Sequence, residues 1–490
     1  MAVKIFSGTI SGLGAEIVEV EVEVSQGLPN TLIIGLIDTS IRESKERVRA
    51  AFKSTTYKYP LARVIVNLAP ANIYKYGTHF DLPIALGILL ASKQAQFNYN
   101  EWAFFGELSL QGQIKPANGV LSFVIAAKTH RIKKVFVPVP NLAEAELVKN
   151  IEIYAVNSLT ELLDLLINNR DYSPPDHKIL REEENYKDFK EIVGQSFAKR
   201  GMEIAVAGGH NILLKGIPGV GKTLLAESLP SIMPALSTDQ LLEVVQIYSI
   251  GGFLNKHRLK PFRNPNRSIS QTSFIGGGRI PKPGEISLAH NGVLFLDEFP
   301  EFPRALIESL REPLESGTIK ISRAQGSYLF PAKFIFVAAQ NPCPCGYYQS
   351  DKTCTCSIGQ INLYKKKISG PILERIDLQV NVEKVDILKV ETAVVESSSQ
   401  ILYRVTKARD IQIDRANLLN AKMDNNEINK HCALNSEASM LIKAAHKKYD
   451  FSARTYFRIL RVARTIADLA QSENISVIHL AEAIQYRLGD

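Results

Sequence analysis

The chain has 490 residues, and its 58 Lys and Arg against 50 Asp and Glu give a formal net charge of +8. Hydrophobic residues make up 45% of the sequence and charged residues 22%. These proportions are those of a folded globular protein, so they exclude a disordered chain, a collagen-like chain and a disulfide-rich mini-protein. At roughly 150 residues per domain, the length predicts about three domains. The small positive excess permits an acidic partner such as nucleic acid but does not identify one.

Nothing in the sequence is typical of secretion or membrane insertion. No long apolar stretch follows the N-terminal residues, and the longest apolar run, residues 84–91, is much shorter than the about 20 residues of a membrane helix. Four of the 5 cysteines lie within residues 343–356, a clustering that indicates metal ligation rather than a disulfide framework. We therefore expect a cytoplasmic protein with no membrane partner.

The first part of the chain mixes strand and helix patterns. Val18–Val24 (VEVEVEV) alternates strictly, as a half-buried strand does. Further strands are predicted at residues 31–34 and 63–67, and helices at 41–52 and 82–90. These patterns predict an α+β domain over residues 1–170, followed by a polar linker, residues 171–190, that contains two adjacent prolines.

The middle of the chain has the pattern of an α/β fold. Helices are predicted at residues 196–207 and 223–229, and strands at 211–215, 292–296 and 333–338. This alternation is typical of a parallel sheet and places an α/β domain at residues 191–390. From residue 391 to 490 the apolar spacing becomes helical, most clearly at 459–470 and 477–484.

A phosphate-binding loop is predicted between the strand at 211–215 and the helix at 223–229. The motif G-x-x-x-x-G-K-[ST] is matched by Gly216, Ile217, Pro218, Gly219, Val220, Gly221, Lys222 and Thr223. Its glycines let backbone N–H groups approach phosphate oxygens, and the following helix adds a favourable dipole. Lys222 would reach the β- and γ-phosphates of ATP, and the Thr223 hydroxyl would bind Mg²⁺.

Two acidic residues follow the strand at 292–296. Four apolar residues bury this strand and put Asp297 at its carboxyl end, where ligands bind in such sheets. Asp297 would hold Mg²⁺, and Glu298 would polarise the attacking water. Two acids at a strand end are by themselves more often solvated, but together with the upstream loop they predict an enzyme that hydrolyses ATP.

Three further polar residues are candidates for the same site. Asn341 follows the buried strand that ends near residue 339 and would orient the water. Arg375 would reach the γ-phosphate held by a neighbouring subunit, and Arg454 would contact the phosphate of its own chain. From the spacing alone, ordinary surface or salt-bridged side chains are the favoured interpretation for both arginines.

The chain resembles the ComM/YifB family, the magnesium-chelatase-like AAA+ ATPases of bacteria. The segments that carry the resemblance extend over essentially the whole chain: Gly216–Thr223, Phe274–Gly284 (FIGGGRIPKPG), Glu285–Glu298, Ile321–Ala324, Asn341–Gly346 (NPCPCG), Ser369–Asp377 and Ser452–Ile466. The resemblance implies that Asn341 is the first sensor, Arg375 the arginine finger and Arg454 the second sensor of an AAA+ site. It also implies an N-terminal Lon-protease-like domain, a central AAA+ domain and a C-terminal helical lid.

The resemblance further implies an assembly and a substrate. It implies a homo-oligomer, a hexameric ring that binds ATP between subunits and moves DNA, single-stranded or branched. The activity implied is branch migration or helicase action that extends heteroduplex during natural transformation, with recombinases as possible partners. The alternative is an ATP-driven remodeller of proteins or an ATPase subunit like that of magnesium chelatase, and likeness of fold alone does not transfer a substrate.

The Lon-like domain lacks the residues of a protease. The matching string is Lys75–Pro83, and where an active Lon-type protease has its Ser this chain has His79. The position of the partner Lys aligns with Leu121. A Ser–Lys dyad needs both groups, so we expect no peptidase activity, and we expect Thr78 to be structural rather than a substitute nucleophile.

Positive charge is concentrated between the two halves of the ATP motif. Residues 244–284 contain seven Lys or Arg and no Asp or Glu. By the resemblance this insertion faces the central pore, so contacts to the DNA backbone are expected, with Phe274 stacked on a base. A strand hairpin at residues 318–329 adds a second basic element. The predicted DNA contacts are Lys256, Arg258, Arg263, Arg267, Arg279, Lys282, Lys320 and Arg323. A solvated basic loop is the alternative.

The clustered cysteines predict a metal site. Cys343 and Cys345 form one close pair, and Cys354 and Cys356 form another. Two pairs of soft thiolates suit a tetrahedral, structural Zn²⁺, although C-x-C is tighter than the commoner C-x₂-C. Four reduced thiols without a metal are the alternative.

Overall fold

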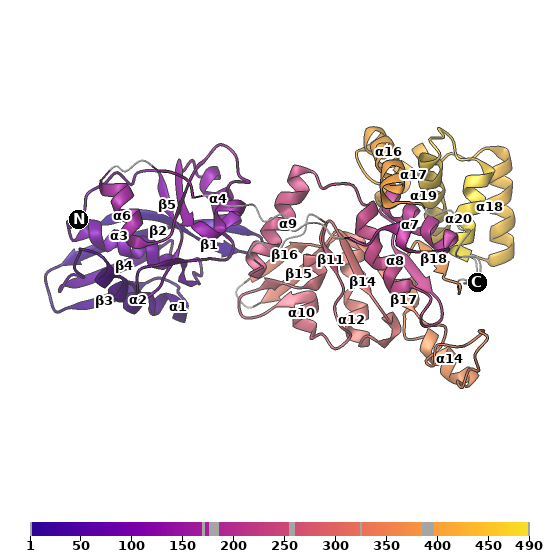
Figure 1. The fold of residues 1–490 in the computed structure, drawn as a ribbon, viewed down its shortest axis with the longest axis horizontal. Helices are drawn as coiled ribbons and strands as arrows, with labels where there is room; N and C mark the ends of the chain where they lie inside the picture. The colour runs from indigo at the N-terminus through magenta and orange to yellow at the C-terminus, as the bar shows by residue number, and fades with distance from the viewer. Residues whose placement is uncertain are drawn as a thin grey trace. The chain divides into compact units, whose positions relative to one another are not determined.

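The computed structural model describes residues 2–168, 172–175, 186–253, 260–323, 326–384 and 396–488. The chain divides into two compact units, shown in Figure 1. The first unit comprises Met1–Glu182 together with Leu241–His257 and Ser322–Leu329. The second comprises Glu183–Gln240, Arg258–Ile321 and Phe330–Asp490. Two segments from the middle of the chain therefore belong to the first unit and not to the α/β domain that surrounds them in sequence.

The first unit is built on a mixed sheet of seven strands in the order β3-β4-β2-β1-β5-β8-β9. The strands are β1 (Val3–Ser11), β2 (Gly14–Ser25), β3 (Asn30–Ile34), β4 (Arg63–Ala69), β5 (Trp102–Phe104), β8 (Lys134–Pro138) and β9 (Glu152–Val156). β2 pairs antiparallel with β1 and β4, and all other pairs in this sheet are parallel. A separate short ladder joins β6 (Glu107–Leu108) to β7 (Ile114–Lys115).

Alternation along β2 explains the two layers of helices in this unit. Val18, Val20 and Val22 are fully buried in one core, which α3 (Asp81–Ala91) also enters. Ile17 points to the other core, which contains α4 (Val120–Thr129). Successive side chains of a strand point to opposite faces, so each face is covered by its own helices. The remaining helices are α1 (Thr39–Arg42), α2 (Ser44–Ala51), α5 (Leu142–Ala145) and α6 (Leu159–Ile167).

The helix predicted over residues 41–52 is two helices, α1 and α2, that meet at Glu43. In a continuous helix the carbonyl of Ser40 would accept the amide of Ser44. Here the guanidinium of Arg47 takes that carbonyl at 2.7 Å and also donates to Ser44 Oγ at 3.1 Å. The side chain of Arg47 thus satisfies a backbone group that the break leaves open.

Helix α9 (Thr238–Gly251) supplies the first segment from the middle of the chain to this unit. Val245 is buried in the same core as Leu121. Gln246 Nε2 donates to Leu13 O at 2.7 Å, and the Gly119 amide donates to Ser249 Oγ at 3.0 Å. The second segment lies in the hairpin of β15 (Thr318–Arg323) and β16 (Gly326–Pro331). The predicted hairpin is confirmed, although the turn residues 324–325 lie outside the described residues.

The second unit is built on a five-stranded sheet in the order β11-β14-β17-β10-β18, and every neighbouring pair is parallel. The strands are β11 (Phe262–Arg263), β14 (Val293–Leu296), β17 (Ile335–Gln340), β10 (Ile212–Lys215) and β18 (Leu378–Asn381). β12 (Gly276–Gly277) and β13 (Lys282–Pro283) form a small hairpin beside it. The predicted parallel sheet is confirmed, and every strand predicted for it is present.

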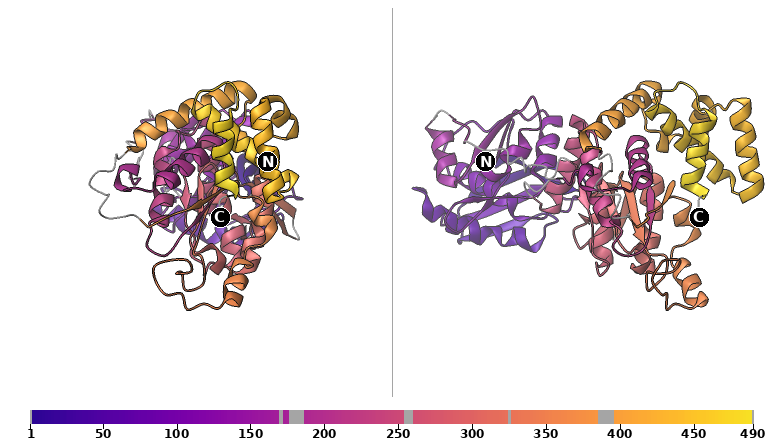
Figure 2. Two further views of the ribbon diagram at one scale, coloured as in Figure 1. Left: turned by 90° about the vertical axis from the view of Figure 1, so that its right-hand side faces the viewer. Right: turned by 45° about the vertical axis from the view of Figure 1, so that its right-hand side comes forward.

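Short helices connect these strands, and a larger helical set ends the chain. The connecting helices are α7 (Ser196–Gly208), α8 (Lys222–Ser228), α10 (Gln271–Ile275), α11 (Glu285–Leu288), α12 (Arg304–Ser309), α13 (Arg311–Ser316), α14 (Ile358–Lys365) and α15 (Gly370–Leu373). The C-terminal helices are α16 (Ser398–Ala416), α17 (Asn425–His431), α18 (Ser436–Tyr449), α19 (Ala453–Leu469) and α20 (Val477–Leu488), and Figure 2 shows them grouped together.

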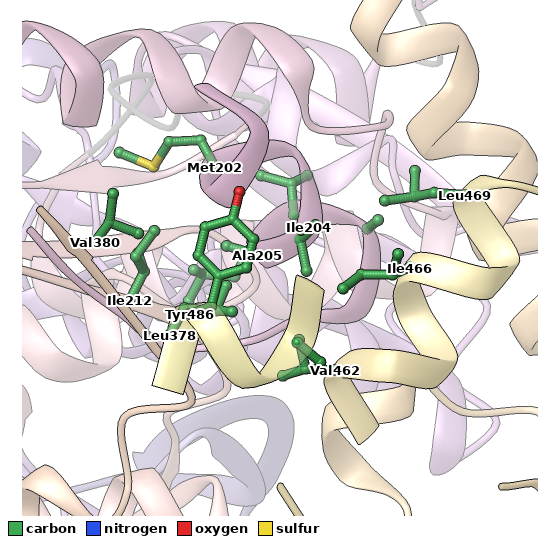
Figure 3. Packing of buried hydrophobic residues seen from close by; sticks show 14 of the residues in the cluster. Met202, Ile204, Ala205, Ile212, Leu378, Val380, Val462, Ile466, Leu469 and Tyr486 are labelled. Carbon is green, nitrogen blue, oxygen red and sulfur yellow. The ribbon is translucent and has the colours of Figure 1, made fainter. Parts of the chain in front are cut away.

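The C-terminal helices share one hydrophobic core with the parallel sheet. Figure 3 shows Tyr486 of α20 beside Ala205 of α7 and Leu378 of β18, and Ile466 of α19 beside Ile204 of α7. The predicted helical region is therefore confirmed, and its apolar stripe is what joins it to the sheet. Within the part of the chain that the structure describes, no helix has both the length and the apolar character needed to cross a membrane.

The carboxyl of Glu144, which receives a hydrogen bond from Ser249 of α9, makes the stability of the first unit depend on pH. Burial raises the pKa of Glu144 to about 7, although hydrogen bonds from Ser249, Asn141 and the Leu121 amide oppose the shift. The folded state therefore holds this proton more tightly than the unfolded chain does. The free energy of unfolding should fall as pH rises from about 4.5 to about 7, by up to about 1.4 kcal/mol per pH unit.

The substitution Glu144→Gln should remove this slope, because an amide stays neutral at every pH. Urea unfolding of the variant at several pH values measures it. Glu146→Gln, two residues further on and half-buried, is the matched control and should keep the wild-type slope. A wild-type slope in Glu144→Gln would contradict the assignment.

Candidate functional site

The order of the parallel sheet brings three chain segments to one edge. β17 lies between β14 and β10, with Lys215 opposite Gln340 and Leu296 opposite Ala338. The residues that follow these strands are Gly216, Asp297 and Asn341. Because the carboxyl ends of parallel strands meet at one edge, the loop, the acidic pair and the asparagine converge there.

The loop of residues 216–223 is shaped to receive phosphate. Gly219 and Gly221 have φ values of +83° and +92°, a conformation that side-chain-bearing residues rarely adopt. A Cβ atom on either glycine would meet no atom within 4 Å, so the space on this side of the loop is open. The chain then enters α8 at Lys222. Glycine at these positions thus keeps a backbone cradle accessible to a ligand.

Lys222 is held inside this cradle. Its Nζ donates to Gly216 O at 2.6 Å, to Ile217 O at 3.0 Å and to Asn341 Oδ1 at 3.0 Å. Burial lowers the pKa of Lys222, while the charges of Asp297 and Glu298 oppose the shift. The hydrogen bond to Asn341, which the sequence did not predict, joins this lysine to the residue that follows β17.

Thr223 and Asp297 form the expected place for Mg²⁺. Thr223 Oγ1 donates to Asp297 Oδ2 at 2.8 Å, so a hydroxyl and a carboxylate oxygen lie next to each other. Oxygen ligands of this kind, completed by water and phosphate, are those that Mg²⁺ takes in nucleotide sites. The neighbouring Glu298 has a φ of +50°, and its Oε2 accepts from Arg267 Nη1 at 2.7 Å. That ion pair was not predicted from the sequence, because its members are 31 residues apart.

Arg375 and Arg454 lie together in an open cleft of about 370 Å³. No residue of the loop 216–223 lines it. Arg375 Nη1 donates to Pro371 O at 2.7 Å and also pairs with Glu315, and Arg454 Nη1 donates to Glu374 at 3.1 Å. The expectation that Arg454 contacts the phosphate bound by its own chain stays a prediction, and in this structure its side chain pairs with Glu374.

The buried carboxylate of Asp377 lines this cleft, and no role for it was predicted from the sequence. Asp377 accepts from Arg458 at 2.6 Å and lies 3.2 Å from His210 Nδ1. Burial opposes ionisation of Asp377, but the hydrogen bond with His210 and the charge of Arg458 outweigh it and lower its pKa. The neighbouring FRILR pattern in α19 gave a signal, since it places Arg458 one turn after Arg454.

Comparisons with known proteins find similarity over nearly the whole chain. Three family models match: "Subunit ChlI of Mg-chelatase" over residues 20–141, "Magnesium chelatase, subunit ChlI" over 188–390, and "Magnesium chelatase, subunit ChlI C-terminal" over 395–487. "Competence protein ComM" of Haemophilus influenzae is 41% identical over 99% of this chain and 97% of its own length. The chain belongs to the ComM/YifB family of magnesium-chelatase-like AAA+ proteins.

Two further relatives define the extent of this membership. YifB of Escherichia coli is 40% identical over 98% of this chain and 96% of its own length, so the family relation covers both units. Lon protease 2 of Bacillus subtilis is 34% identical over 23% of this chain and 21% of that protein. The relation to Lon proteases is therefore partial.

The two positions expected for a protease dyad carry His79 and Leu121 instead of Ser and Lys. His79 is buried, with Nε2 2.7 Å from Gly8 O, and its ring stacks on Phe105 at 4.0 Å. Leu121 is fully buried. Thr78 donates its hydroxyl to Glu107 and serves as a local hydrogen-bond donor. Neither of the two positions therefore carries the Ser hydroxyl or the Lys amine that the dyad needs.

The basic stretch does not form one exposed loop. Residues 244–250 are mostly buried in α9, and Phe274 is fully buried, so the expected stacking of Phe274 on a base is wrong. Arg263 Nε donates to Glu285 at 2.6 Å, and Arg267 pairs with Glu298. These two arginines of the acid-free stretch therefore pair with acids that lie outside it. Lys256 and Arg258 lie outside the described residues.

The other predicted DNA contacts lie on two hairpins. Arg279 and Lys282 are exposed on the β12–β13 hairpin, and Lys320 and Arg323 are exposed on β15. The two elements touch, since a Cβ on Gly276 would lie 2.8 Å from Ile321 Cδ1. This contact brings Lys282 and Lys320 into one region of the second unit.

The four predicted metal ligands also converge. The sulfur atoms of Cys343, Cys345, Cys354 and Cys356 all lie within 4.8 Å of one another. A cluster of this kind fits a metal ion.

The substitution Lys222→Ala should weaken the binding of a fluorescent ATP analogue by at least about ten-fold, because it removes the cation from the phosphate cradle. Equilibrium fluorescence titration measures the change. Lys187→Ala is the matched control. Lys187 Nζ pairs at 2.5 Å with Glu227, which lies on α8 as Lys222 does, so the affinity for the analogue should stay at the wild-type value.

Proposed function

We propose that the protein is an ATPase that works as a hexameric ring and uses ATP and Mg²⁺ to move branches along DNA.

 The observation that carries the proposal is the convergence of Lys222, Thr223, Asp297 and Asn341 at one edge of the sheet. These groups supply phosphate binding, a Mg²⁺ site and a polar group for the attacking water. Glu298, next to Asp297, is the residue that polarises that water.

The proposed ring rests on the separation of the two arginines from the loop of their own chain. Arg375 and Arg454 share one open cleft that the loop residues 216–223 do not line. Arginines act on ATP by neutralising the charge that develops on the γ-phosphate. We therefore assign both to the ATP of the neighbouring subunit, which revises the same-chain role expected for Arg454.

Mixing inactive subunits tests this assignment. Arg375→Ala and Lys222→Ala proteins should each lose at least about a hundred-fold in ATPase rate, and a mixture should regain activity where an intact loop meets an intact cleft. A mixture of Arg375→Ala with Arg454→Ala should not regain activity, because no single subunit then offers both arginines. Recovery in that second mixture, measured as phosphate release, would return Arg454 to the ATP of its own chain.

The proposed substrate is the backbone of single-stranded or branched DNA. Arg279, Lys282 and Lys320 are exposed on two hairpins that touch each other, and such a group suits phosphate contacts without base reading. The relative named "Competence protein ComM" supports a role in competence, where incoming strands recombine. Branch migration that extends heteroduplex in natural transformation, with recombinases as partners, is the activity we propose.

A branch-migration assay with purified protein tests the proposed substrate. The wild-type protein should move a branched junction in the presence of ATP, and Glu298→Gln should bind ATP but fail to move it. The double variant Arg279→Glu with Lys282→Glu should weaken DNA binding by at least about ten-fold at moderate salt and leave ATP binding unchanged. ATP turnover that responds to a protein partner and ignores DNA would instead support the protein-remodelling or chelatase-like alternative.

The pair Arg267–Glu298 links the basic stretch to the proposed chemistry. Glu298 cannot polarise water fully while its carboxylate is bound to Arg267, and a DNA phosphate would compete for the same guanidinium. Both side chains are about half exposed, so the pair contributes at most about 1 kcal/mol.

The substitution Arg267→Ala should therefore raise the ATPase rate without DNA by up to about five-fold and reduce the further stimulation by DNA. Steady-state phosphate release with and without DNA measures both. Arg263→Ala is the control, since Arg263 pairs with Glu285 and does not contact Glu298. An unchanged basal rate in Arg267→Ala would show that the pair does not restrain Glu298.

A further inference from the structure

Four cysteine sulfurs meet beside the proposed ATP site. The Sγ atom of Cys345 lies 3.4 Å from that of Cys343 and 3.5 Å from that of Cys354, and Cys343 and Cys354 are 3.8 Å apart. Cys356 completes the group, with all four sulfurs within 4.8 Å of one another. Cys343 is buried and the other three are half-buried, so the group is partly shielded from water.

These separations fit a single tetrahedral ion. A zinc–sulfur bond of about 2.3 Å places the sulfurs of a tetrahedral site about 3.8 Å apart. A disulfide would need about 2.05 Å. A multi-iron cluster would hold the four sulfurs further apart, because its own iron and sulfide atoms lie between them. The amide of Tyr348 also donates to Cys343 Sγ at 3.3 Å, and hydrogen bonds of this kind hold a metal-bound thiolate in its orientation.

The first cysteine pair is in direct contact with the phosphate-binding loop. Gly346, the residue after Cys345, has a φ of +89°. A Cβ on Gly346 would lie 2.6 Å from Cγ of Pro218 and 2.7 Å from its Cδ. The backbone of the cysteine turn therefore lies against the ring of Pro218 with no room for a side chain.

The second cysteine pair is tied to Asn341 from the other side. Ser357, the residue after Cys356, caps α14 by accepting the amide of Gln360 at 3.2 Å. The hydroxyl of Tyr364, near the end of this helix, accepts the backbone N–H of Asn341. Asn341 in turn accepts from Lys222 at 3.0 Å. Residues 341–364 thus form a loop that leaves the ATP site at Asn341, passes through the four cysteines and returns to Asn341.

We propose that Cys343, Cys345, Cys354 and Cys356 bind one structural Zn²⁺ ion, and that this ion holds Pro218 and Asn341 in the positions that nucleotide binding requires. The ion closes the loop between the two cysteine pairs. The four cysteines are positioning residues, since none of them touches the nucleotide. The inference rests on the proposed ATP site for its effect but not for the metal itself.

Loss of the metal has a physical consequence for the loop. Without the ion, the two cysteine pairs repel as thiolates or separate as thiols, and the turn at Gly346 is no longer fixed against Pro218. A cradle that is not held before binding must be ordered by the nucleotide, which lowers affinity. The effect should therefore be seen in nucleotide binding, while the secondary structure stays in place.

The first experiment measures metal in the full-length protein. Elemental analysis of the wild type should give one zinc per chain, and Co²⁺ substitution should give the absorption of a tetrahedral thiolate site. Cys354→Ser with Cys356→Ser should lose the metal. Cys354→His should keep it, since imidazole is an accepted fourth ligand. Cys432→Ser, a change at the cysteine outside the cluster, should also keep it. Wild-type protein without bound metal after expression and dialysis in zinc would overturn the proposal.

The second experiment separates the metal from its effect on the loop. Removing zinc from the wild type with a chelator should weaken binding of a fluorescent ATP analogue by at least about ten-fold, and added Zn²⁺ should restore it. Gly346→Ala should keep one zinc per chain and still bind the analogue at least about ten-fold more weakly, because its methyl group displaces Pro218. Gly359→Ala is the matched control: a Cβ there lies 3.8 Å from Ser357 Oγ, so affinity should be unchanged.

Two outcomes would overturn the coupling. Zinc-free protein that binds the analogue as tightly as the wild type would show that the metal does not position the loop. Wild-type affinity in Gly346→Ala would show that the contact with Pro218 carries no effect. A wild-type protein that holds zinc but binds no nucleotide would refute the proposed ATPase while leaving the metal site intact, so the two failures are distinguishable.

Discussion

The candidate site depends on the register of three parallel strands. Lys215 of β10 lies opposite Gln340 of β17, and Leu296 of β14 lies opposite Ala338. This alignment, together with the loop and helix α8 that follow β10, places Thr223 Oγ1 2.8 Å from Asp297 and Lys222 Nζ 3.0 Å from Asn341. A shift of one residue in any strand would turn its side chains to the opposite face of the sheet. The buried apolar faces of these strands prevent that shift, so the hydrophobic core is what fixes the polar chemistry.

The same strand ends explain which parts of the site the sequence could predict. A buried strand is visible as a short apolar run, and the residue after it is then known to lie at the ligand-binding edge. Asp297 and Asn341 were found in this way. Partners that depend on a long-range fold could not be found: the ion pair of Arg267 with Glu298 and that of Arg263 with Glu285 join residues 31 and 22 positions apart. A charge count treats both arginines as available, whereas the structure pairs them.

Burial was also misjudged where local composition was ambiguous. Phe274 stands among polar and glycine residues, a setting that suits an exposed aromatic, yet it is fully buried. The position of Arg454 likewise follows from packing, since α19 shares its core with α7 and α20. The resemblance to a family gave the fold correctly, but the neighbours of an arginine are set by packing. Within the basic stretch, Arg263 and Arg267 form ion pairs with acids outside it, whereas Arg279 and Lys282 are exposed on the β12–β13 hairpin.

The first unit shows how a protease-like fold can lose its dyad and gain a structural role. The backbone of Leu121, at the position of the missing lysine, donates to the buried Glu144, and Glu144 is hydrogen-bonded by Ser249 of α9. Leu121 and Val245 also share one core. A lysine at position 121 would place a charge in this apolar contact, which is unfavourable unless the charge is paired. Packing of α9 and retention of a catalytic lysine are therefore competing demands on the same site.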